Sequence, residues 1–297
     1  MTYSIVARDR DTGQLGVAVQ SKYFSVGSVV SWAEPGVGAV ATQSTAEISH
    51  GPRGLELMRQ GRSAAEVLAE LTAADELRES RQVGMVDANG GAASHTGQVC
   101  IAAAGHMVGD GYSCQANLML RDSVWGAMAG AYESAHGELP ERLLAALDAA
   151  ENEGGDLRGR QSVALLLVSG DRSLPAWRKE MELRVEDHPD PLGEIRRLLG
   201  LRRAFDRVDV VEEVLLKGGD PATALRELET FADLGDPNID FTRAIGLAMA
   251  GRVEEARALV TRLVAIAPGW AVAGRRFADA GVIPDDPTLV AALTPAG

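Results

Sequence analysis

The chain has 297 residues, enough for two domains of ordinary size, and 46% of them are hydrophobic, which allows a substantial core. The formal net charge is −13 at pH 7 and the basic residues are scattered, so we expect no nucleic-acid partner, because phosphate binding needs clustered Lys and Arg. No apolar run reaches the roughly 18 residues of a membrane-spanning helix, so we also expect that the chain is not a membrane protein.

The beginning of the chain predicts a cytoplasmic protein. Residues 8–11 (RDRD) stand where a secretory leader would need an apolar run. Cys100 and Cys114 are the only cysteines, and neither has a CxxC or metal-ligand spacing. We therefore expect packing cysteines, no metal and no cofactor.

Two β-hairpins are predicted first. Residues 3–7 and 15–19 flank a turn rich in Asp and Gly, and residues 25–33 and 37–43 flank a second turn at Glu34-Pro35-Gly36. Both hairpins precede the first helical pattern.

Helices and further strands then alternate as far as residue 170. Residues 50–61 and 63–75 predict two helices, and Ser63 with Glu66 predicts a capping box at the start of the second. The segments that follow are a hairpin at residues 81–97 around Asn89-Gly90, two short strands within residues 99–119, helices at residues 122–137 and 139–155, and a buried strand at residues 161–170. Strand runs that alternate with helix pairs predict an α+β fold, with two sheets between helical layers.

The last third of the chain predicts a separate helical domain. Pro189 and Pro191 mark a junction, after which a helix begins. Residues 219–231 are similar to residues 251–263, a period close to the roughly 34 residues of tetratricopeptide repeats. We predict domains at residues 1–187 and 188–297, the second being either tetratricopeptide-like or a plain helical bundle.

Thr2 is the first candidate for chemistry. Removal of Met1 would place the Thr2 α-amine, with a pKa of about 8, beside its own hydroxyl. The amine could then take the hydroxyl proton, so that one residue supplies both nucleophile and base. A threonine after Met1 is also common without any such role, so the surroundings must decide.

Two polar clusters could complete such a site. At residues 41–45 a strand gives way to a helical region, and Gln43 adds an amide donor for a developing oxyanion. Ser113, Gln115 and Asn117 interrupt an apolar strand before a helix. Because buried amides need partners, this second cluster either holds a turn together or lines a pocket.

A third cluster stands on a glycine-rich loop before the last buried strand. Asp156 could orient a terminal amine, and Arg158 or Arg160 could bind a substrate carboxylate. The alternative is a solvated loop with a surface ion pair. His95 and His106 lie in β-rich segments without metal-ligand spacing, so we expect hydrogen-bonded structural histidines, with substrate binding as the alternative.

Residues 2–170 resemble the domain-of-unknown-function family 1028, which is described as similar to N-terminal nucleophile (Ntn) hydrolases. The stretches that carry the resemblance are TYSIVARD, LGVAVQSKYF, GVGAVATQS, HGPRGLELM, SHTG, GHMVGDGYSCQANLM and GGDLRGRQSVALL. The resemblance implies a four-layer αββα sandwich like that of proteasome subunits. Relatives often carry a C-terminal extension described as peptidoglycan-binding, which the residues from about 188 onward resemble.

The resemblance also implies roles for individual residues. The catalytic set is the nucleophile Thr2, the oxyanion region at Gln43 and Ser44, the amine-supporting Asn117, and Asp156. The side chains that we expect around the substrate are Ser21, Thr42, His95, His106, Gln115, Arg158 and Arg160. Proteasome-type sites place a Lys near the nucleophile, and residues 20–22 (Gln-Ser-Lys) and SVVSWA offer no equivalent.

Two hypotheses of function follow. In the first, the protein is an Ntn-type amidohydrolase that cleaves a small linear or cyclic amide with Thr2, and Ser4 or Ser21 are the alternative nucleophiles. In the second, which the missing Lys favours, a catalytically inactive scaffold binds a partner through its helical C-terminal domain. Both hypotheses are compatible with a homo-oligomer, which the resemblance to Ntn-like sandwiches leads us to expect.

Overall fold

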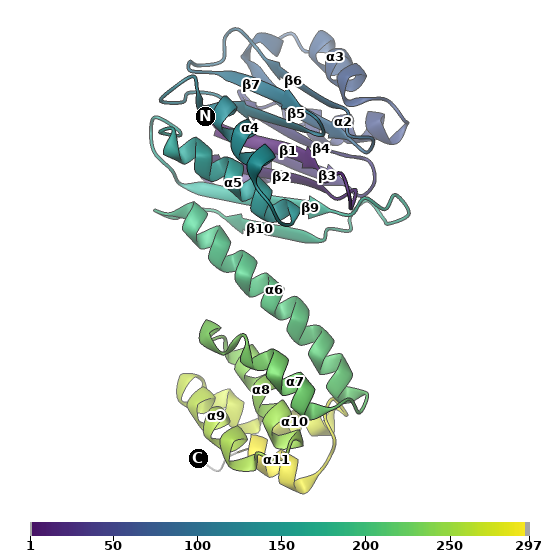
Figure 1. The fold of residues 1–297 in the computed structure, drawn as a ribbon, viewed down its shortest axis with the longest axis vertical. Helices are drawn as coiled ribbons and strands as arrows, with labels where there is room; N and C mark the ends of the chain where they lie inside the picture. Colours follow the sequence, from purple (N-terminus) through teal and green to yellow (C-terminus); the bar gives the residue numbers. More distant parts are fainter. Residues whose placement is uncertain (1, 295–297) are drawn as a thin grey trace. The chain divides into compact units, whose positions relative to one another are not determined.

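The structure is a computed structural model that describes residues 2–294, without the side chains of residues 214 and 216. The chain divides into two compact units, Met1–Leu198 and Leu199–Gly297, and helix α6 (Pro191–Leu216) runs across the division. Two antiparallel sheets and their helices form the first unit, whereas the second is helical (Figure 1). The predicted α+β class is confirmed.

Both sheets of the first unit are antiparallel throughout, with six and four strands within residues 2–294. The six-stranded sheet has the order β10-β9-β2-β1-β8-β7, and its strands are β1 (Thr2–Arg8), β2 (Leu15–Ser21), β7 (Gly105–Gly109), β8 (Tyr112–Ala116), β9 (Ser162–Val168) and β10 (Met181–Val185). The four-stranded sheet has the order β3-β4-β5-β6, and its strands are β3 (Ser31–Glu34), β4 (Gly38–Ser44), β5 (Arg81–Asp87) and β6 (Ala92–Thr96).

Helices cover one face of each sheet. Helices α2 (His50–Arg59) and α3 (Ala64–Ala74) pack on the four-stranded sheet, and α4 (Val124–Ser134) and α5 (Leu139–Asn152) pack on the six-stranded sheet (Figure 1). The predicted capping box at the start of α3 is present: Ser63 accepts from the Glu66 main-chain N–H, and the Glu66 carboxylate accepts from the Ser63 N–H.

The remaining faces of the two sheets pack on each other. Buried Val and Ala side chains from β1, β2, β4 and β5 share one apolar cluster, which includes Val6, Val17 and Ala41. Side chains alternate along a strand, so Thr2, Ser4 and Val6 face this inner space. The intervening Tyr3 faces α5, where its hydroxyl donates to Glu151.

Two segments of the first unit differ from the prediction. Residues 25–33, predicted as one strand, contain the short helix α1 (Gly27–Val30) before β3. Here packing prevails over the β-propensity of valine, because the helical turn buries Val26 and Val30 in the cluster between the sheets. Strand β10 was not predicted, although its MELRV sequence alternates, and it pairs along β9 at the edge of the sheet.

The second unit is helical, as predicted. After α6, its helices are α7 (Pro221–Glu229), α8 (Pro237–Met249), α9 (Val253–Ile266), α10 (Ala273–Asp279) and α11 (Pro287–Leu293). Asp220, Asp236 and Asp286 each cap a helix that begins with proline, a combination that satisfies free N–H groups and presets the first turn. Among residues 2–294, no helix combines the length and the apolar character that crossing a membrane requires.

Candidate functional site

Thr2 is the first residue of β1 and pairs in register with Ser21, the last residue of β2. The Thr2 hydroxyl donates a hydrogen bond to Ser21 Oγ at 3.1 Å. On the opposite side, the main chains of Thr2 and Asn117 exchange two hydrogen bonds, with N···O distances of 3.3 and 3.0 Å. Thr2 is only 4% exposed. The predicted nucleophile is therefore buried, with polar partners on the strands to both sides.

A network of polar side chains joins the two sheets beside Thr2. Ser4 Oγ donates to Gln43 Oε1 and accepts from Gln115 Nε2, both at 2.7 Å, and Ser113 Oγ donates to Gln115 Oε1 at 3.0 Å. Gln43 Nε2 in turn donates to the Thr2 carbonyl oxygen at 3.2 Å. Gln43 and Gln115 belong to separate polar clusters in the sequence, and the fold brings them together.

Gln82, on β5, connects this network to the surface, and sequence analysis missed it. Its Oε1 accepts from Gln43 Nε2 and from Asn117 Nδ2, both at 2.8 Å, and its Nε2 donates to Thr96 Oγ1 at 2.9 Å. Thr96 Oγ1 also contacts His106 Nδ1 at 2.8 Å, so His106 forms the outer end of the chain of contacts. The available signal was a glutamine second in an otherwise largely apolar strand.

Asp156 lies next to Ser21. Its fully buried carboxylate accepts from the main-chain N–H of Lys22 at 3.1 Å and from Arg158 Nη2 at 2.8 Å. Because Lys22 follows Ser21, the carboxylate lies beside the strand partner of Thr2. Arg158 forms an ion pair with Asp156, which holds the glycine-rich loop in place.

Two predicted residues on β4 do not join the network. Thr42 lies on the opposite face of the strand from Gln43, and its hydroxyl donates to the Glu47 carbonyl at 3.0 Å. Ser44 ends the strand with a φ of 68°, a left-handed conformation that turns the chain towards α2. The structure therefore separates both residues from the inner face on which Thr2 lies.

His95 and Arg160 also lie apart from Thr2. His95 Nε2 contacts the Arg78 carbonyl at 2.8 Å, and the ring lies on the opposite face of β6 from Thr96. Arg160 is exposed and lies 3.8 Å from Glu151 and 3.4 Å from Asp190. Neither side chain contacts the network of polar side chains that joins the two sheets beside Thr2.

The site thus combines a hydrogen-bonded pair of hydroxyl groups, a main-chain N–H held by a carbonyl, and a buried carboxylate close by. Burial raises the pKa of the neighbouring Tyr3 phenol, and Glu151 raises it further, so this group stays neutral. Within the described part of the chain, no cluster of three or more His, Cys, Asp or Glu side chains is placed to hold a metal ion.

The comparisons with known proteins agree with the resemblance in the sequence. A family model described as "Family of unknown function (DUF1028)" matches residues 2–195. The crystal structure of protein SPO2555 from Silicibacter pomeroyi, of the same family model, is 30% identical and has a TM-score of 0.61 over 67% of this chain and 88% of that chain.

A second solved structure is more distant. Anbu (ancestral beta-subunit) from Yersinia bercovieri is 15% identical over 67% of this chain and 93% of that chain, with a TM-score of 0.31. No curated protein matches the sequence. On the strength of the family model and the 30% identical structure, the chain belongs to the family of unknown function DUF1028.

Proposed function

We propose that the protein is an Ntn-type amidohydrolase that cleaves a small linear or cyclic amide, with Thr2 as its nucleophile once Met1 is removed. The observation that supports this proposal best is the position of Thr2. It begins β1, its side chain lies on the inner face of the sheet, and its hydroxyl is hydrogen-bonded to Ser21.

The order of layers supports the same proposal. Helices α2 and α3, the four-stranded sheet, the six-stranded sheet, and helices α4 and α5 pack in this order in the first unit. We interpret this arrangement as the four-layer αββα sandwich of Ntn hydrolases, in which the nucleophile begins an inner strand.

The proposed reaction has two steps. Thr2 Oγ1 attacks the carbonyl carbon of the amide while its α-amine takes the hydroxyl proton, and the C–N bond then breaks as the leaving nitrogen receives that proton. The resulting ester on Thr2 is attacked by water, which the α-amine deprotonates. The products are an amine and a carboxylic acid, and Thr2 is regenerated.

The neighbours of Thr2 have separate roles in this proposal. The Asn117 carbonyl, 3.3 Å from the Thr2 nitrogen, holds the amine, and the buried carboxylate of Asp156 stabilises the ammonium that forms when the amine takes the hydroxyl proton. Gln43 Nε2 already has acceptors in Thr2, Gln82 and Gln115, so we assign it to holding Thr2. Asn117 Nδ2 donates to Gln82 Oε1 at 2.8 Å and makes only a long contact of 3.4 Å to the Thr2 carbonyl, so we assign its second N–H as the donor that turns to the oxyanion.

An α′,β′-epoxyketone tests the proposal without a known substrate, because it closes a morpholine ring only on a residue with both a free α-amine and a nucleophilic oxygen. We expect intact-mass analysis to show a chain that begins at Thr2 and gains one adduct. Thr2→Ser should keep the adduct, and Thr2→Ala should lose it. Retention of Met1, or an equal adduct in Thr2→Ala, would exclude Thr2 as the nucleophile. Ser4 and Ser21 have no free α-amine and cannot close the morpholine ring, so an adduct that Thr2→Ala loses would also exclude them as the labelled nucleophile.

Partner binding by the helical segment is a second candidate function. Helices α7 and α9 begin at equivalent positions of the sequence repeat, and the matched residues Ala224 and Ala256 are both buried, as are Leu228 and Val260. We propose a tetratricopeptide-like module at residues 188–297, and a cytoplasmic protein that self-associates. If the protein is only a scaffold, the chain processed at Thr2 will form no epoxyketone adduct.

A further inference from the structure

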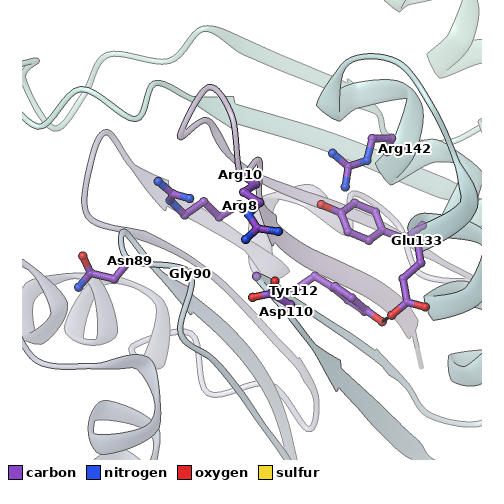
Figure 2. Close-up of a pocket in the computed structure, with 10 residues that line it drawn as sticks. Arg8, Arg10, Asn89, Gly90, Asp110, Tyr112, Glu133 and Arg142 are labelled. Atoms are coloured by element: carbon purple, nitrogen blue, oxygen red, sulfur yellow. Dashed lines mark hydrogen bonds between the residues drawn. The ribbon is translucent and has the colours of Figure 1, made fainter.

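A pocket lies at the opposite end of β1 from Thr2. Its volume is about 470 Å³, and it is lined by side chains from β1, the β7–β8 turn, α4 and α5 (Figure 2). The seven residues of β1 separate it from Thr2 by roughly 20 Å. Nothing in the proposed reaction uses this pocket.

One part of the pocket wall is cationic. Arg8 Nε is buried and has no hydrogen-bond partner among residues 2–294, and neither Arg8 nor Arg10 has a carboxylate within ion-pair distance in that range. Arg142 differs, because Asp9 neutralises it at 3.0 Å and its guanidinium lies 4.5 Å from the centre of the Tyr132 ring. Two guanidinium groups therefore remain for an anionic group of a ligand.

Another part of the wall is anionic. Asp110 is exposed in the turn between β7 and β8, and Glu133 projects from α4. Glu133 Oε1 accepts from the Tyr112 hydroxyl at 2.5 Å, a contact drawn in Figure 2. Neither carboxylate forms an ion pair with a described residue, so both are available to a cationic group.

The cationic and anionic parts of the pocket wall together limit the kind of ligand that can bind. A neutral molecule without an acceptor would leave the buried Nε of Arg8 unsatisfied, which is costly. A phosphate or a dicarboxylate would be repelled by Asp110 and Glu133. The rings of Tyr112 and Tyr132, with centroids 4.9 Å apart, add an apolar wall. We propose that this pocket binds a small zwitterion with one carboxylate and one ammonium group, of the size of an amino acid or a dipeptide.

Calorimetry on the full chain tests this site with four probes: glycylglycine, acetate, ethylammonium and inorganic phosphate. Glycylglycine is expected to bind once per chain, and at least tenfold more tightly than the other three. Arg8→Gln and Asp110→Asn should each weaken it about tenfold. Arg178→Gln, an equal change at an exposed position outside the pocket, should leave binding unchanged.

Three results would overturn the proposal: no saturable binding of glycylglycine, equal or tighter binding of acetate or phosphate, or full affinity in both pocket variants. If the melting temperature shows that Arg8→Gln is unfolded, Asp110→Asn decides, since its side chain is exposed in a turn. Thr2→Ala should bind glycylglycine like the unaltered chain, which separates this site from the proposed active site.

Discussion

The hydroxyl groups of Thr2 and Ser21 meet across the first two strands, 3.1 Å apart. Ser21 is therefore the side chain best placed to orient the proposed nucleophile. We expect Ser21→Ala to slow epoxyketone labelling of Thr2 about tenfold, the equivalent of one lost hydrogen bond of about 1.4 kcal/mol. Time-resolved mass spectrometry would measure the rate, with Ser134→Ala on the surface of α4 as the matched control. An unchanged rate would show that Ser21 does not orient Thr2.

Gln82 should matter more for stability than any exposed glutamine. Gln82→Leu removes the acceptor of two amide donors, those of Gln43 and Asn117, inside the protein. We expect the free energy of unfolding to fall by about 1–3 kcal/mol, because Gln43 Nε2 keeps two other acceptors whereas Asn117 Nδ2 keeps only its 3.4 Å contact to the Thr2 carbonyl. Urea denaturation would measure it. Gln60→Leu, on the surface at the end of α2, should change stability by less than about 0.5 kcal/mol.

Gly84 leaves space for Gln115 between the sheets. A Cβ at residue 84 would lie 2.2 Å from Gln115 Oε1, so Gly84→Ala should displace that side chain and destabilise the protein by about 1–3 kcal/mol. Beyond its own helical turn, a Cβ added at Gly130 in α4 would meet no described atom within 4 Å, and Gly130→Ala should stabilise the protein by about 0.5–1 kcal/mol. Thermal denaturation should show a lower melting temperature for Gly84→Ala and a higher one for Gly130→Ala. Equal shifts of the melting temperature in the two variants would contradict the prediction.

His50, buried at the start of α2, should make stability depend on pH. Desolvation lowers its pKa from the ordinary 6.5, against the opposing charges of Asp75 and Glu47. As the pH falls below 6.5, the unfolded chain therefore binds the proton first, and the free energy of unfolding decreases until the folded pKa is passed. Above pH 6.5, His50 is neutral in both the folded and the unfolded chain, and its contribution to the free energy of unfolding no longer changes with pH.

Replacing His50 isolates this effect. Urea denaturation at about pH 8 and about pH 5.5 should show a smaller loss of stability for His50→Gln than for the unaltered chain. Desolvation also lowers the pKa of His106. His106→Gln therefore shows how much of the pH dependence of stability that is left in His50→Gln comes from His106. Identical slopes in His50→Gln and the unaltered chain would refute the role of His50.

Local signals in the sequence predicted much of the fold. The capping box at Ser63, the hairpin at Asn89-Gly90 and the helix that begins at Pro191 each depend on residues close together in the chain. Strand β10 has a weaker signal, because its side chains are mostly half-buried at a sheet edge and its residues alternate among charged neighbours. The helical turn at residues 27–30 depends on packing between sheets, which no local pattern contains.

Some members of the polar network beside Thr2 could be predicted from the sequence, but the connections between them could not. Thr2, Gln43, Gln115 and Asn117 were identified as polar residues at strand ends, and they meet in the structure. Gln82 was missed because its position opposite Gln43 follows from the register of β4 and β5, which is set by tertiary packing. For the same reason, Thr42 could not be separated from Gln43 before the inner face of β4 was known.

The amide network between the sheets has a consequence for how precisely Thr2 is positioned. Contacts among valine and alanine side chains depend little on direction, so they would allow small sliding movements of one sheet over the other. Hydrogen bonds from Ser4 to Gln43 and from Gln115 to Ser4 depend strongly on angle and therefore select a single alignment. A core with these polar side chains replaced by apolar ones of equal volume could keep its stability and still misplace Thr2.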